Sequence, residues 1–288
     1  MDITDNEFTA LQRYVRDVCG INIPQDKCYL IQQRLEPVAR DKGCQSFTAL
    51  NQLLNDEDSQ ALRDEVVAAI STNETSFFRD RHPFKAFSEH VLPWLGERVK
   101  ERKRTHQEGH AQPMARIWSA GSSTGQEPYS LAILVHEYTR SHHYLGIRRE
   151  DFAILATDIC ERALARARAA AYHQVEMSRG LAPDVRDRYF QTRGKDWWLR
   201  EDIRSMVHFQ KMNLMEPTSL MPACDLILCR NVLIYFDEDT KRSVISYFHR
   251  KLQPGGYLML GSAENLYCLS DRFESVPVGE TLLYRKLD

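Results

Sequence analysis

Hydrophobic residues recur every three or four positions along the first part of the chain, which is the spacing of one buried face of a helix. The repeating positions are Phe8, Leu11, Val15 and Val18, then Ile31, Leu35 and Val38, then Phe47, Leu50 and Leu54, then Leu62, Val66 and Ile70. Thr4 and Glu7 have the spacing of a capping box, and Gly20 and Gly43 stand where helices should end. The pattern predicts a small all-helical domain over residues 1–90.

A charged stretch follows this domain. Residues 97–104 mix glutamates with arginines and lysines, and residues 106–110 are polar. We interpret residues 91–114 as a linker made of a solvated helix end and a loop. A nucleic-acid-binding patch is the alternative, but the interleaved glutamates and the lack of aromatic side chains disfavour it.

After Ala115 the pattern changes to short apolar runs that alternate with helical spacing. Strands are predicted over residues 117–120, 152–157, 207–212, 225–229, 257–260 and 282–285, and helices over residues 127–140, 161–171 and 237–252. The last helix is expected to be halted by Pro254-Gly255-Gly256. Strands separated by helices imply an α/β fold with a mainly parallel, doubly wound sheet, whose ligands bind outside the carboxyl ends of the strands. This Rossmann-like domain is predicted over residues 115–288, with a small β-insertion at about 172–206.

The composition is that of an ordinary globular protein, with 43% hydrophobic and 27% charged residues and a net charge of −2. Nothing in this balance favours nucleic acid or an anionic membrane. The start lacks the features of a secretory signal, and no apolar run approaches the ~18 residues of a membrane span. The seven cysteines are scattered and form no C-x-x-C pair, so we expect reduced thiols in a cytoplasmic protein. We expect no metal site, since the adjacent His142 and His143 would point to different faces of a helix.

The stretch from Ile117 to Ser130 carries the most specific signal. An apolar run ends in small residues, turns through Gly121 and Gly125, and opens a helix with Glu127 and Pro128. Small residues let backbone N–H groups approach a ligand closely. The loop lacks the G-x-G-x-x-G pattern that seats a pyrophosphate, and its carboxylate would repel one. It suits a neutral or cationic nucleoside, and S-adenosylmethionine, with its amino group and sulfonium, is the ligand that we expect.

Polar side chains stand at the other predicted strand ends. Asp158 would accept hydrogen bonds from two ribose hydroxyls, because an ionised carboxylate has two acceptor oxygens; the alternative is a cap for the helix that begins at Glu161. Asn213 offers a donor and an acceptor to an adenine edge, or is a turn residue before Met215. Asn231 has the same dual capacity.

Two further segments allow a functional and a structural interpretation. Tyr235 would lie just past a strand end, where its hydroxyl could reach a reacting group, or it is a core aromatic with its hydroxyl in water. Spacing alone does not choose between these two roles. Residues 71–79 place polar side chains, Phe77, Phe78 and Arg79 at the domain junction. They form either a loop anchored by the aromatic rings or a lid that brings Arg79 to a carboxylate.

Taken together, these segments resemble the bacterial chemotaxis receptor methyltransferase family (CheR). The matching motifs are T-N-x-T-x-F-F-R at 72–79, S-x-x-x-S-T-G-x-E-P-Y-S at 119–130, the acid at 158, N-L at 213–214 and C-R-N-V-x-I-Y-F at 229–236. They occur in order over almost the whole chain. The resemblance implies an S-adenosylmethionine-dependent O-methyltransferase that forms methyl esters on glutamate side chains of chemoreceptor cytoplasmic helices, for sensory adaptation, with S-adenosylhomocysteine as product.

The resemblance also implies the site residues. The cofactor site is expected to be lined by Asn73, Thr75, Arg79, Gly121, Glu127, Asp158, Asn213, Leu214, Arg230 and Asn231. Arg79 and Tyr235 are expected to flank the reacting groups as catalytic residues. A glutamate side chain is ionised at pH 7 and needs no general base, and a sulfonium needs neither an acid nor a metal to leave. The site then has to align the reacting atoms and exclude water.

Two departures from the family pattern concern the receptor. Members that dock on a receptor's C-terminal pentapeptide carry a Gly-aromatic-polar-Gly type of loop in the insertion, whereas residues 193–199 look shorter and lack the second glycine. We therefore expect no pentapeptide tether. Residues 27–42, where the family often has a strongly basic helix, hold four basic and two acidic side chains. Recognition of the receptor is expected to be weaker or aimed at a different receptor.

Three alternative functions follow from these observations. The first is a methyltransferase of a parallel chemosensory system, such as one controlling type IV pili. The second is a nucleic-acid or small-molecule methyltransferase, which the acidic balance and the lack of an N-P-P-Y motif disfavour. The third is a non-catalytic cofactor-binding sensor, which the intact Arg79, Asp158 and Tyr235 disfavour. The expected partner is a chemoreceptor methylation helix, with no nucleic acid, no membrane insertion and a monomeric chain.

Overall fold

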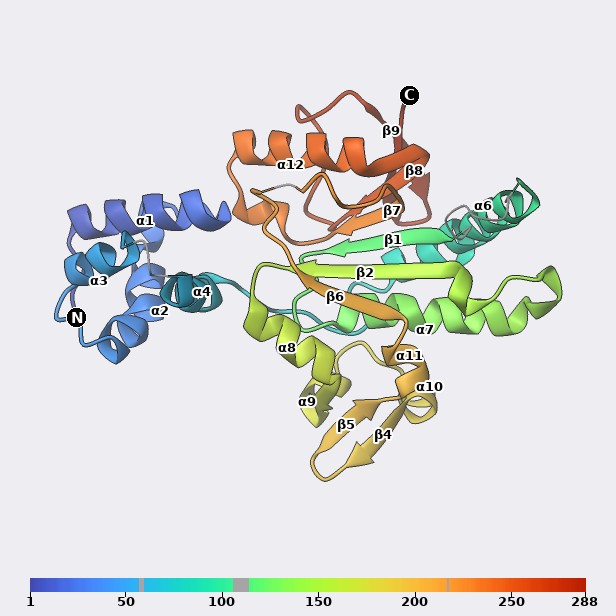
Figure 1. The fold of residues 1–288 in the computed structure, drawn as a ribbon, viewed down its shortest axis with the longest axis horizontal. Coiled ribbons are helices and arrows are strands. Elements are labelled where there is room, and N and C mark those ends of the chain that lie inside the picture. Colours follow the sequence, from blue (N-terminus) through green and yellow to red (C-terminus); the bar gives the residue numbers. More distant parts are fainter. Residues whose placement is uncertain (57–59, 106–113, 217) are drawn as a thin grey trace.

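A computed structural model describes residues 1–56, 60–105, 114–216 and 218–288. Figure 1 shows a helical N-terminal part beside a larger part built around a twisted sheet. The polar loop predicted at residues 106–110 lies outside the described residues. Within them, every helix is too short or too polar to cross a membrane.

The N-terminal part is helical, as predicted. Its helices are α1 (Asp5–Cys19), α2 (Cys28–Asp41), α3 (Phe47–Leu54) and α4 (Gln60–Ile70), with the short 3-10 turn η1 (Gln25–Lys27) before α2. The capping box of α1 is present, and Gly20 ends the helix with a left-handed φ of 75°. The predicted apolar positions are buried together in one cluster, which includes Phe8, Leu35 and Phe47. Each helix buries its apolar face against the others, and this shared burial holds the four helices together.

The next helices pack against the sheet part of the molecule. They are α5 (His82–Ala86), the π-helical turn η2 (Phe87–Val91) and α6 (Leu92–Thr105). Phe84, Phe87 and Leu95 are buried in the same cluster as Ile117, which lies in the sheet strand Ala115–Ala120. Much of the segment predicted as a linker is thus a packed helix. The domain limits stay a prediction, and this packing favours a division near residues 71–76 over one at residue 90.

The main sheet has the order β6-β2-β1-β7-β8-β10-β9 among the described residues. Its strands are β1 (Ala115–Ala120), β2 (Phe152–Asp158), β6 (Val207–Lys211), β7 (Cys224–Cys229), β8 (Leu252–Leu260), β9 (Phe273–Val278) and β10 (Thr281–Lys286). β1 is parallel to β2 and β7, whereas β10 is antiparallel to both β8 and β9. The predicted doubly wound, mainly parallel sheet is confirmed, with an antiparallel edge.

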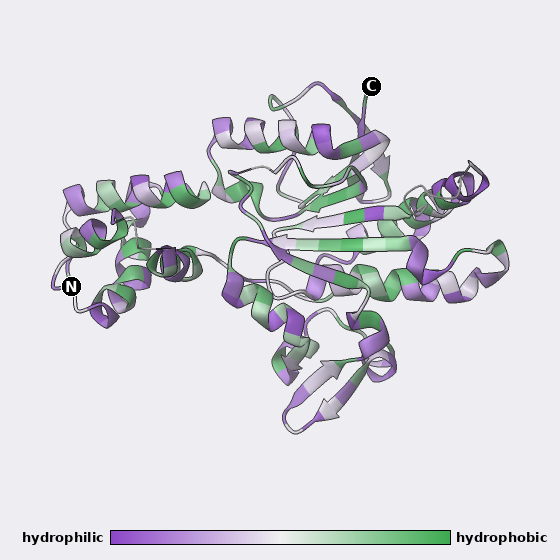
Figure 2. Cartoon of the chain, in the orientation of Figure 1, coloured by the Kyte–Doolittle hydropathy of each residue, from purple (hydrophilic) through white to green (hydrophobic). Residues whose placement is uncertain are grey.

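Helices cover both faces of this sheet (Figure 1). They are α7 (Gln126–Ser141) and α8 (Glu161–Ala169) on one face and α12 (Glu238–Lys251) on the other. Ile117 is buried with residues of α7 and α8, and its neighbour Trp118 with residues of α12. Successive side chains of a strand point to opposite faces, so both must be apolar in a covered strand. In Figure 2 hydrophobic and hydrophilic residues are mixed along each helix.

Two details of the sheet differ from the prediction. Strand β9 was not predicted, because its outward positions are polar and exposed and Pro277 interrupts the pattern. The helix ends at Lys251, but Pro254-Gly255-Gly256 lies within β8, where the register against β7 shifts between Cys224 and Leu226. A bulge accommodates residues that would otherwise weaken a strand.

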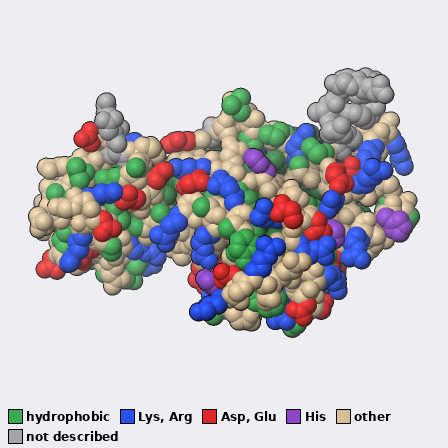
Figure 3. Space-filling model, turned by 60° about the horizontal axis from the view of Figure 1, so that its bottom comes forward, with side chains coloured by type: hydrophobic (Ala, Val, Ile, Leu, Met, Phe, Trp, Pro, Cys, Tyr) green, Lys and Arg blue, Asp and Glu red, His purple; other side chains and the backbone are tan. Residues whose placement is uncertain are grey.

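The predicted β-insertion is present and projects from the sheet part (Figure 1). Its strands are β3 (Ala171–His173), β4 (Phe190–Arg193) and β5 (Asp196–Leu199) in the antiparallel order β3-β5-β4, accompanied by α9 (Gln174–Met177), α10 (Pro183–Tyr189) and α11 (Glu201–Arg204). The ring of Phe77 meets those of Tyr172 and Phe190 edge-on, with centroids 5.0 and 5.3 Å away. On the face in Figure 3, Lys and Arg side chains lie among Asp and Glu side chains.

Candidate functional site

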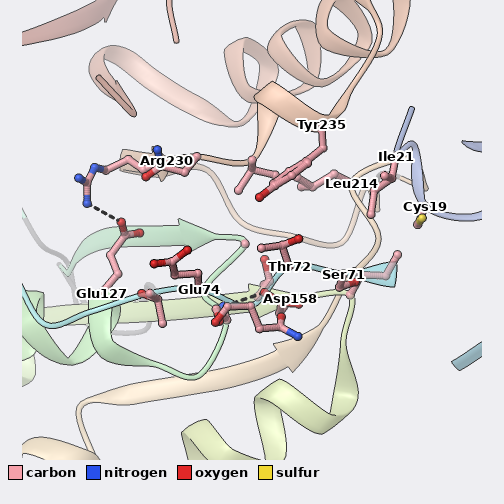
Figure 4. A pocket seen from close by; sticks show the side chains of 18 of the residues that line it. Cys19, Ile21, Ser71, Thr72, Glu74, Glu127, Asp158, Leu214, Arg230 and Tyr235 are labelled. Carbon is pink, nitrogen blue, oxygen red and sulfur yellow. Dashed lines mark hydrogen bonds and ion pairs between the residues drawn. The ribbon is translucent and has the colours of Figure 1, made fainter. Parts of the chain in front are cut away.

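The carboxyl ends of β1, β2, β6 and β7 enclose an open cavity together with residues 71–75, Arg79 and the end of α1. Figure 4 shows Glu74, Glu127 and Asp158 on one side of it, and Tyr235 and Leu214 on the other. Every predicted site residue lines this cavity: Asn73, Thr75, Arg79, Gly121, Glu127, Asp158, Asn213, Leu214, Arg230, Asn231 and Tyr235. The structure thus brings residues from five separate segments of the chain to one place.

The glycine loop lies against the end of β2. The N–H of Gly121 donates to the carbonyl oxygen of Thr157 over 2.8 Å, and Gly121 has a φ of +76°. A Cβ at this position would lie only 2.4 Å from Cγ2 of Val232. Gly125, with a φ of +95°, is the N-cap of α7. Glycine is therefore required at residue 121 by conformation and by space.

Glu127 and Arg230 form a buried pair at the wall of the cavity. Oε1 of Glu127 accepts from the hydroxyl of Ser119 over 2.8 Å, and Oε2 accepts from Nη1 of Arg230 over 3.0 Å. Nη2 of Arg230 donates to the carbonyl oxygen of Arg79 and to Asp80. The guanidinium of Arg230 is therefore engaged chiefly with the protein, where it fixes Glu127 and residues 79–80.

The segment around Arg79 has an unusual backbone. Phe78, Asp80 and Arg81 have φ values of 49°, 69° and 55°, a region that costs a residue other than glycine of order 1–3 kcal/mol. The N–H of Phe78 donates to the hydroxyl of Ser130 over 3.0 Å, which helps to hold the segment in place. Nη1 of Arg79 donates to the carbonyl oxygen of Glu74 over 3.1 Å, at the rim of the cavity.

Asp158 contacts main-chain N–H groups at the start of α8 and in the glycine loop, and its contact with ribose hydroxyls stays a prediction. Its Oδ1 accepts from the N–H of Cys160 over 2.9 Å, at the start of α8, and its Oδ2 accepts from the N–H of Ser123 over 2.7 Å. Each oxygen keeps a second lone pair, and the carboxylate lines the cavity. Burial raises the pKa of Asp158 above its ordinary value, although main-chain hydrogen bonds act in the opposite direction.

Asn213 has the turn role in this structure. Its Oδ1 accepts from the N–H of Met215 over 3.1 Å, and its Nδ2 donates to the carbonyl oxygen of Val18 over 2.8 Å. The side chain thus joins the end of β6 to the end of α1, and the groups expected to meet an adenine edge are in use. Contact of Asn213 with adenine stays a prediction.

The end of α1 is a part of the cavity that the sequence did not predict. Cys19 and Ile21 line it, and the N–H of Asn22 donates to the carbonyl oxygen of Tyr235 over 2.8 Å. A Cβ on Gly20 would lie 2.8 Å from Sδ of Met215, so this turn packs closely on the sheet part. The only signal was a helix stop at Gly20, since a contact between two domains leaves no periodicity.

The loop after β7 carries Asn231 and Tyr235. Asn231 has a φ of +58°, and its Oδ1 is buried without a hydrogen-bond partner in the described residues. Tyr235 is half-buried, with its ring directed into the cavity (Figure 4). An unpaired acceptor of this kind is costly unless a ligand supplies a donor.

The residues fit S-adenosylmethionine. Glu127 and Asp158 bring carboxylate oxygens to the cavity, which are the acceptors that an amino group and hydroxyls require, and Oδ1 of Asn231 is a further acceptor without a donor in the described residues. Apolar wall is supplied by Cys19, Ile21, Ile159, Met212, Leu214 and Phe236. In the described part of the chain, His, Cys, Asp and Glu form no group of three or more that could hold a metal ion.

Comparison with known proteins identifies the family of the chain. Residues 6–71 match the all-alpha domain of CheR methyltransferases, and residues 73–281 match their SAM-binding domain. The chain is 35% identical to chemotaxis protein methyltransferase 1 of Pseudomonas aeruginosa, over 99% of both chains. It is 37% identical to the chemotaxis protein methyltransferase of Vibrio anguillarum, over 98% of both. The chain is therefore a member of the CheR family of S-adenosylmethionine-dependent methyltransferases.

Proposed function

We propose that this protein transfers methyl groups to the carboxylates of glutamate side chains on cytoplasmic helices of chemoreceptors. The observation that carries the proposal is that residues of all the family motifs line one cavity at the carboxyl edge of the sheet. The relatives match this chain over nearly their full length and are named chemotaxis protein methyltransferases. These names support a chemosensory substrate. We place the activity in the cytoplasm, in a monomeric protein.

S-adenosylmethionine supplies an electrophilic methyl group and leaves as S-adenosylhomocysteine. The residues proposed to hold it are Asn73, Thr75, Arg79, Gly121, Glu127, Asp158, Asn213, Leu214, Arg230 and Asn231. Glu127 would accept from its amino group, and Asp158 from its ribose hydroxyls. Arg230 contributes through Glu127, to which its guanidinium is bound.

Arg79 and Tyr235 are the proposed catalytic residues. The substrate carboxylate is already ionised at pH 7, so the site has to orient it and exclude water. The Arg79 guanidinium at the cavity rim would pair with this carboxylate and direct one oxygen inward. A very tight pair would stabilise the ground state as much as the transition state, so a partly exposed arginine suits the task. The Tyr235 hydroxyl would interact with the reacting centre from the opposite wall.

Two features support a receptor contact that differs from the usual family pattern. The hairpin of β4 and β5 turns through only Gly194 and Lys195, and the guanidinium of Arg193 lies over the Trp198 ring at 5.4 Å. On α2, Arg34 donates to the carbonyl oxygen of Ile70 and to Thr72, so this basic residue is engaged within the protein. We therefore propose docking without a pentapeptide tether. Micromolar binding of a receptor-tail peptide in calorimetry would refute that part.

The function is tested by transfer of tritiated methyl groups to cytoplasmic receptor fragments. Base-labile label on a receptor, lost in Arg79→Ala, is the result expected for a glutamyl methyl ester. Receptors of a type IV pilus system are included as substrates, since they distinguish a parallel chemosensory pathway. Intact cofactor binding without transfer to any receptor would leave a cofactor-binding sensor instead.

A further inference from the structure

A single carboxylate after strand β8 gathers four main-chain N–H groups. Oε2 of Glu264 accepts from Asn231 over 2.8 Å and from Gly261 over 2.8 Å. Its Oε1 accepts from Val232 over 2.9 Å and from Ile234 over 3.2 Å. Three of these donors belong to the loop that follows β7. Strand β7 is the neighbour of β8 in the sheet. The carboxylate thus ties the ends of two adjacent parallel strands together.

The loop held in this way carries several residues of the cavity wall, among them Asn231 and Tyr235. Asn231 adopts a left-handed φ of +58° and presents its unpaired Oδ1, and Tyr235 follows four residues later. Left-handed backbone is uncommon for residues other than glycine, although asparagine adopts it more readily than most, and the hydrogen bonds to Glu264 help to hold it here. Hydrogen bonds to an ionised acceptor are the strong kind that can do this.

The surroundings of the carboxylate are fitted to it. A Cβ on Gly261 would lie 2.7 Å from Oε2 of Glu264 and 2.8 Å from the nitrogen of Asn231. Any larger residue at position 261 would therefore push the two strand ends apart. The φ of Gly261 lies outside the left-handed region, so the close approach of Glu264, and not backbone conformation, is what requires glycine here.

We propose that Glu264 is a positioning residue for the methyltransferase site. Its carboxylate fixes the main chain of residues 231–234 and thereby places the acceptor of Asn231 and the ring of Tyr235. This role rests on the proposed function in so far as Tyr235 acts on the reacting groups. Glu264 lies outside all of the motifs that identified the site, and it reaches that site only through backbone amides.

The matched variants Glu264→Gln and Glu280→Gln test this role. The first replaces one carboxylate oxygen by an N–H₂ group that faces main-chain donors, whereas Glu280 is exposed in the turn between β9 and β10. Hydrogen exchange of the amides of residues 231, 232 and 234 is expected to become at least about tenfold faster in Glu264→Gln alone. The rest of the sheet should keep its protection, and the affinity for S-adenosylhomocysteine in calorimetry should fall.

Activity provides a second readout. A displacement of the order of 1 Å costs up to ~100-fold in rate, so kcat is expected to fall about 10- to 100-fold while KM for the receptor changes less than about threefold. Unchanged exchange in residues 231–234 together with unchanged kcat in Glu264→Gln would overturn the proposal. If the wild-type protein methylates no receptor, the proposed function is refuted instead. The role of Glu264 is then still decided by hydrogen exchange and by cofactor binding.

Gly261→Ala keeps the proposal testable if Glu264→Gln does not fold. It retains the Glu264 side chain but displaces its carboxylate, because the added methyl group would lie 2.7 Å from Oε2. The same local loss of amide protection and the same fall in kcat are expected. A normal exchange pattern in Gly261→Ala would show that the contact can shift without cost, which contradicts the proposed role.

Discussion

Nη1 of Arg230 donates to Oε2 of Glu127 over 3.0 Å, where the two side chains are 1% and 12% exposed. The same guanidinium donates to the carbonyl oxygen of Arg79 and to the Asp80 carboxylate. One buried cation therefore connects the first turn of α7 with the segment that carries Arg79. Its hydrogen bonds hold these two parts of the cavity wall together.

Replacement of Arg230 by an apolar side chain is expected to lower the free energy of unfolding. Arg230→Met leaves the Glu127 carboxylate without its buried partner, which typically costs about 3–5 kcal/mol of unfolding free energy. Urea denaturation measures this loss. Arg162→Met, at an exposed position of α8, is the control and should change stability by less than about 0.5 kcal/mol. Equal stability of the two variants would contradict the role assigned to Arg230.

The glycine loop should not tolerate a side chain. Gly121→Ala introduces a methyl group 2.4 Å from Val232 at a φ of +76°, so the loop or the facing residue has to move. We expect a loss of about 1–3 kcal/mol in stability and at least about tenfold weaker binding of S-adenosylhomocysteine. Calorimetry measures the affinity, and Gly43→Ala, also left-handed but with open space around its Cβ, controls for backbone strain. Similar affinities in both variants would rule out the steric explanation.

The contact between Asn213 and α1 should affect the cofactor indirectly. Asn213→Ala removes the acceptor for Met215 and the donor to Val18, at a cost of about 1–3 kcal/mol. Binding of S-adenosylhomocysteine is expected to weaken because the end of α1 is released. Val18→Ala keeps the carbonyl that Asn213 contacts and serves as the control. If the affinity for S-adenosylhomocysteine falls while the stability of the protein and the protection of α1 in hydrogen exchange stay unchanged, a direct adenine contact is favoured instead.

The buried Asp158 makes stability depend on pH. Burial raises the pKa of this carboxyl in the folded state, so the native protein binds its proton more tightly than the unfolded chain. Stability from this group is highest below the ordinary Asp pKa of about 3.9 and falls as the pH rises through the raised value. Urea denaturation between pH 4 and pH 7 should therefore show wild type losing stability relative to Asp158→Asn. A difference that is constant or that grows with pH in favour of wild type would contradict this sign.

Much of the fold could be predicted because burial leaves a period in the sequence. The helix positions of Phe8 and Leu35 and the two-sided apolar strand at Ile117 and Trp118 each reflect a local repeat. Strand β9 was missed because its outward residues face water and Pro277 interrupts it. The segment of α6 was interpreted as a linker because its exposed charges hide the buried Leu95.

The cavity residues could be predicted where chemistry and motif coincide in one segment. What could not be predicted is which atoms of these residues are already occupied. Arg230 and Asn213 line the cavity as expected, but their polar groups are largely bound to Glu127 and to Val18. Such partners lie 103 and 195 positions away in the chain, a distance over which the sequence shows no spacing rule.

Through the end of α1, the helical part and the sheet part line the same cavity. Cys19 and Ile21 supply wall to the cavity, while Asn213 and the carbonyl of Tyr235 hold this turn against the sheet. A cofactor bound in this cavity would contact both parts, and its affinity would then include the free energy of holding them together. Exchange of the helical part between relatives is therefore expected to alter cofactor retention, even with every residue of the sheet part unchanged.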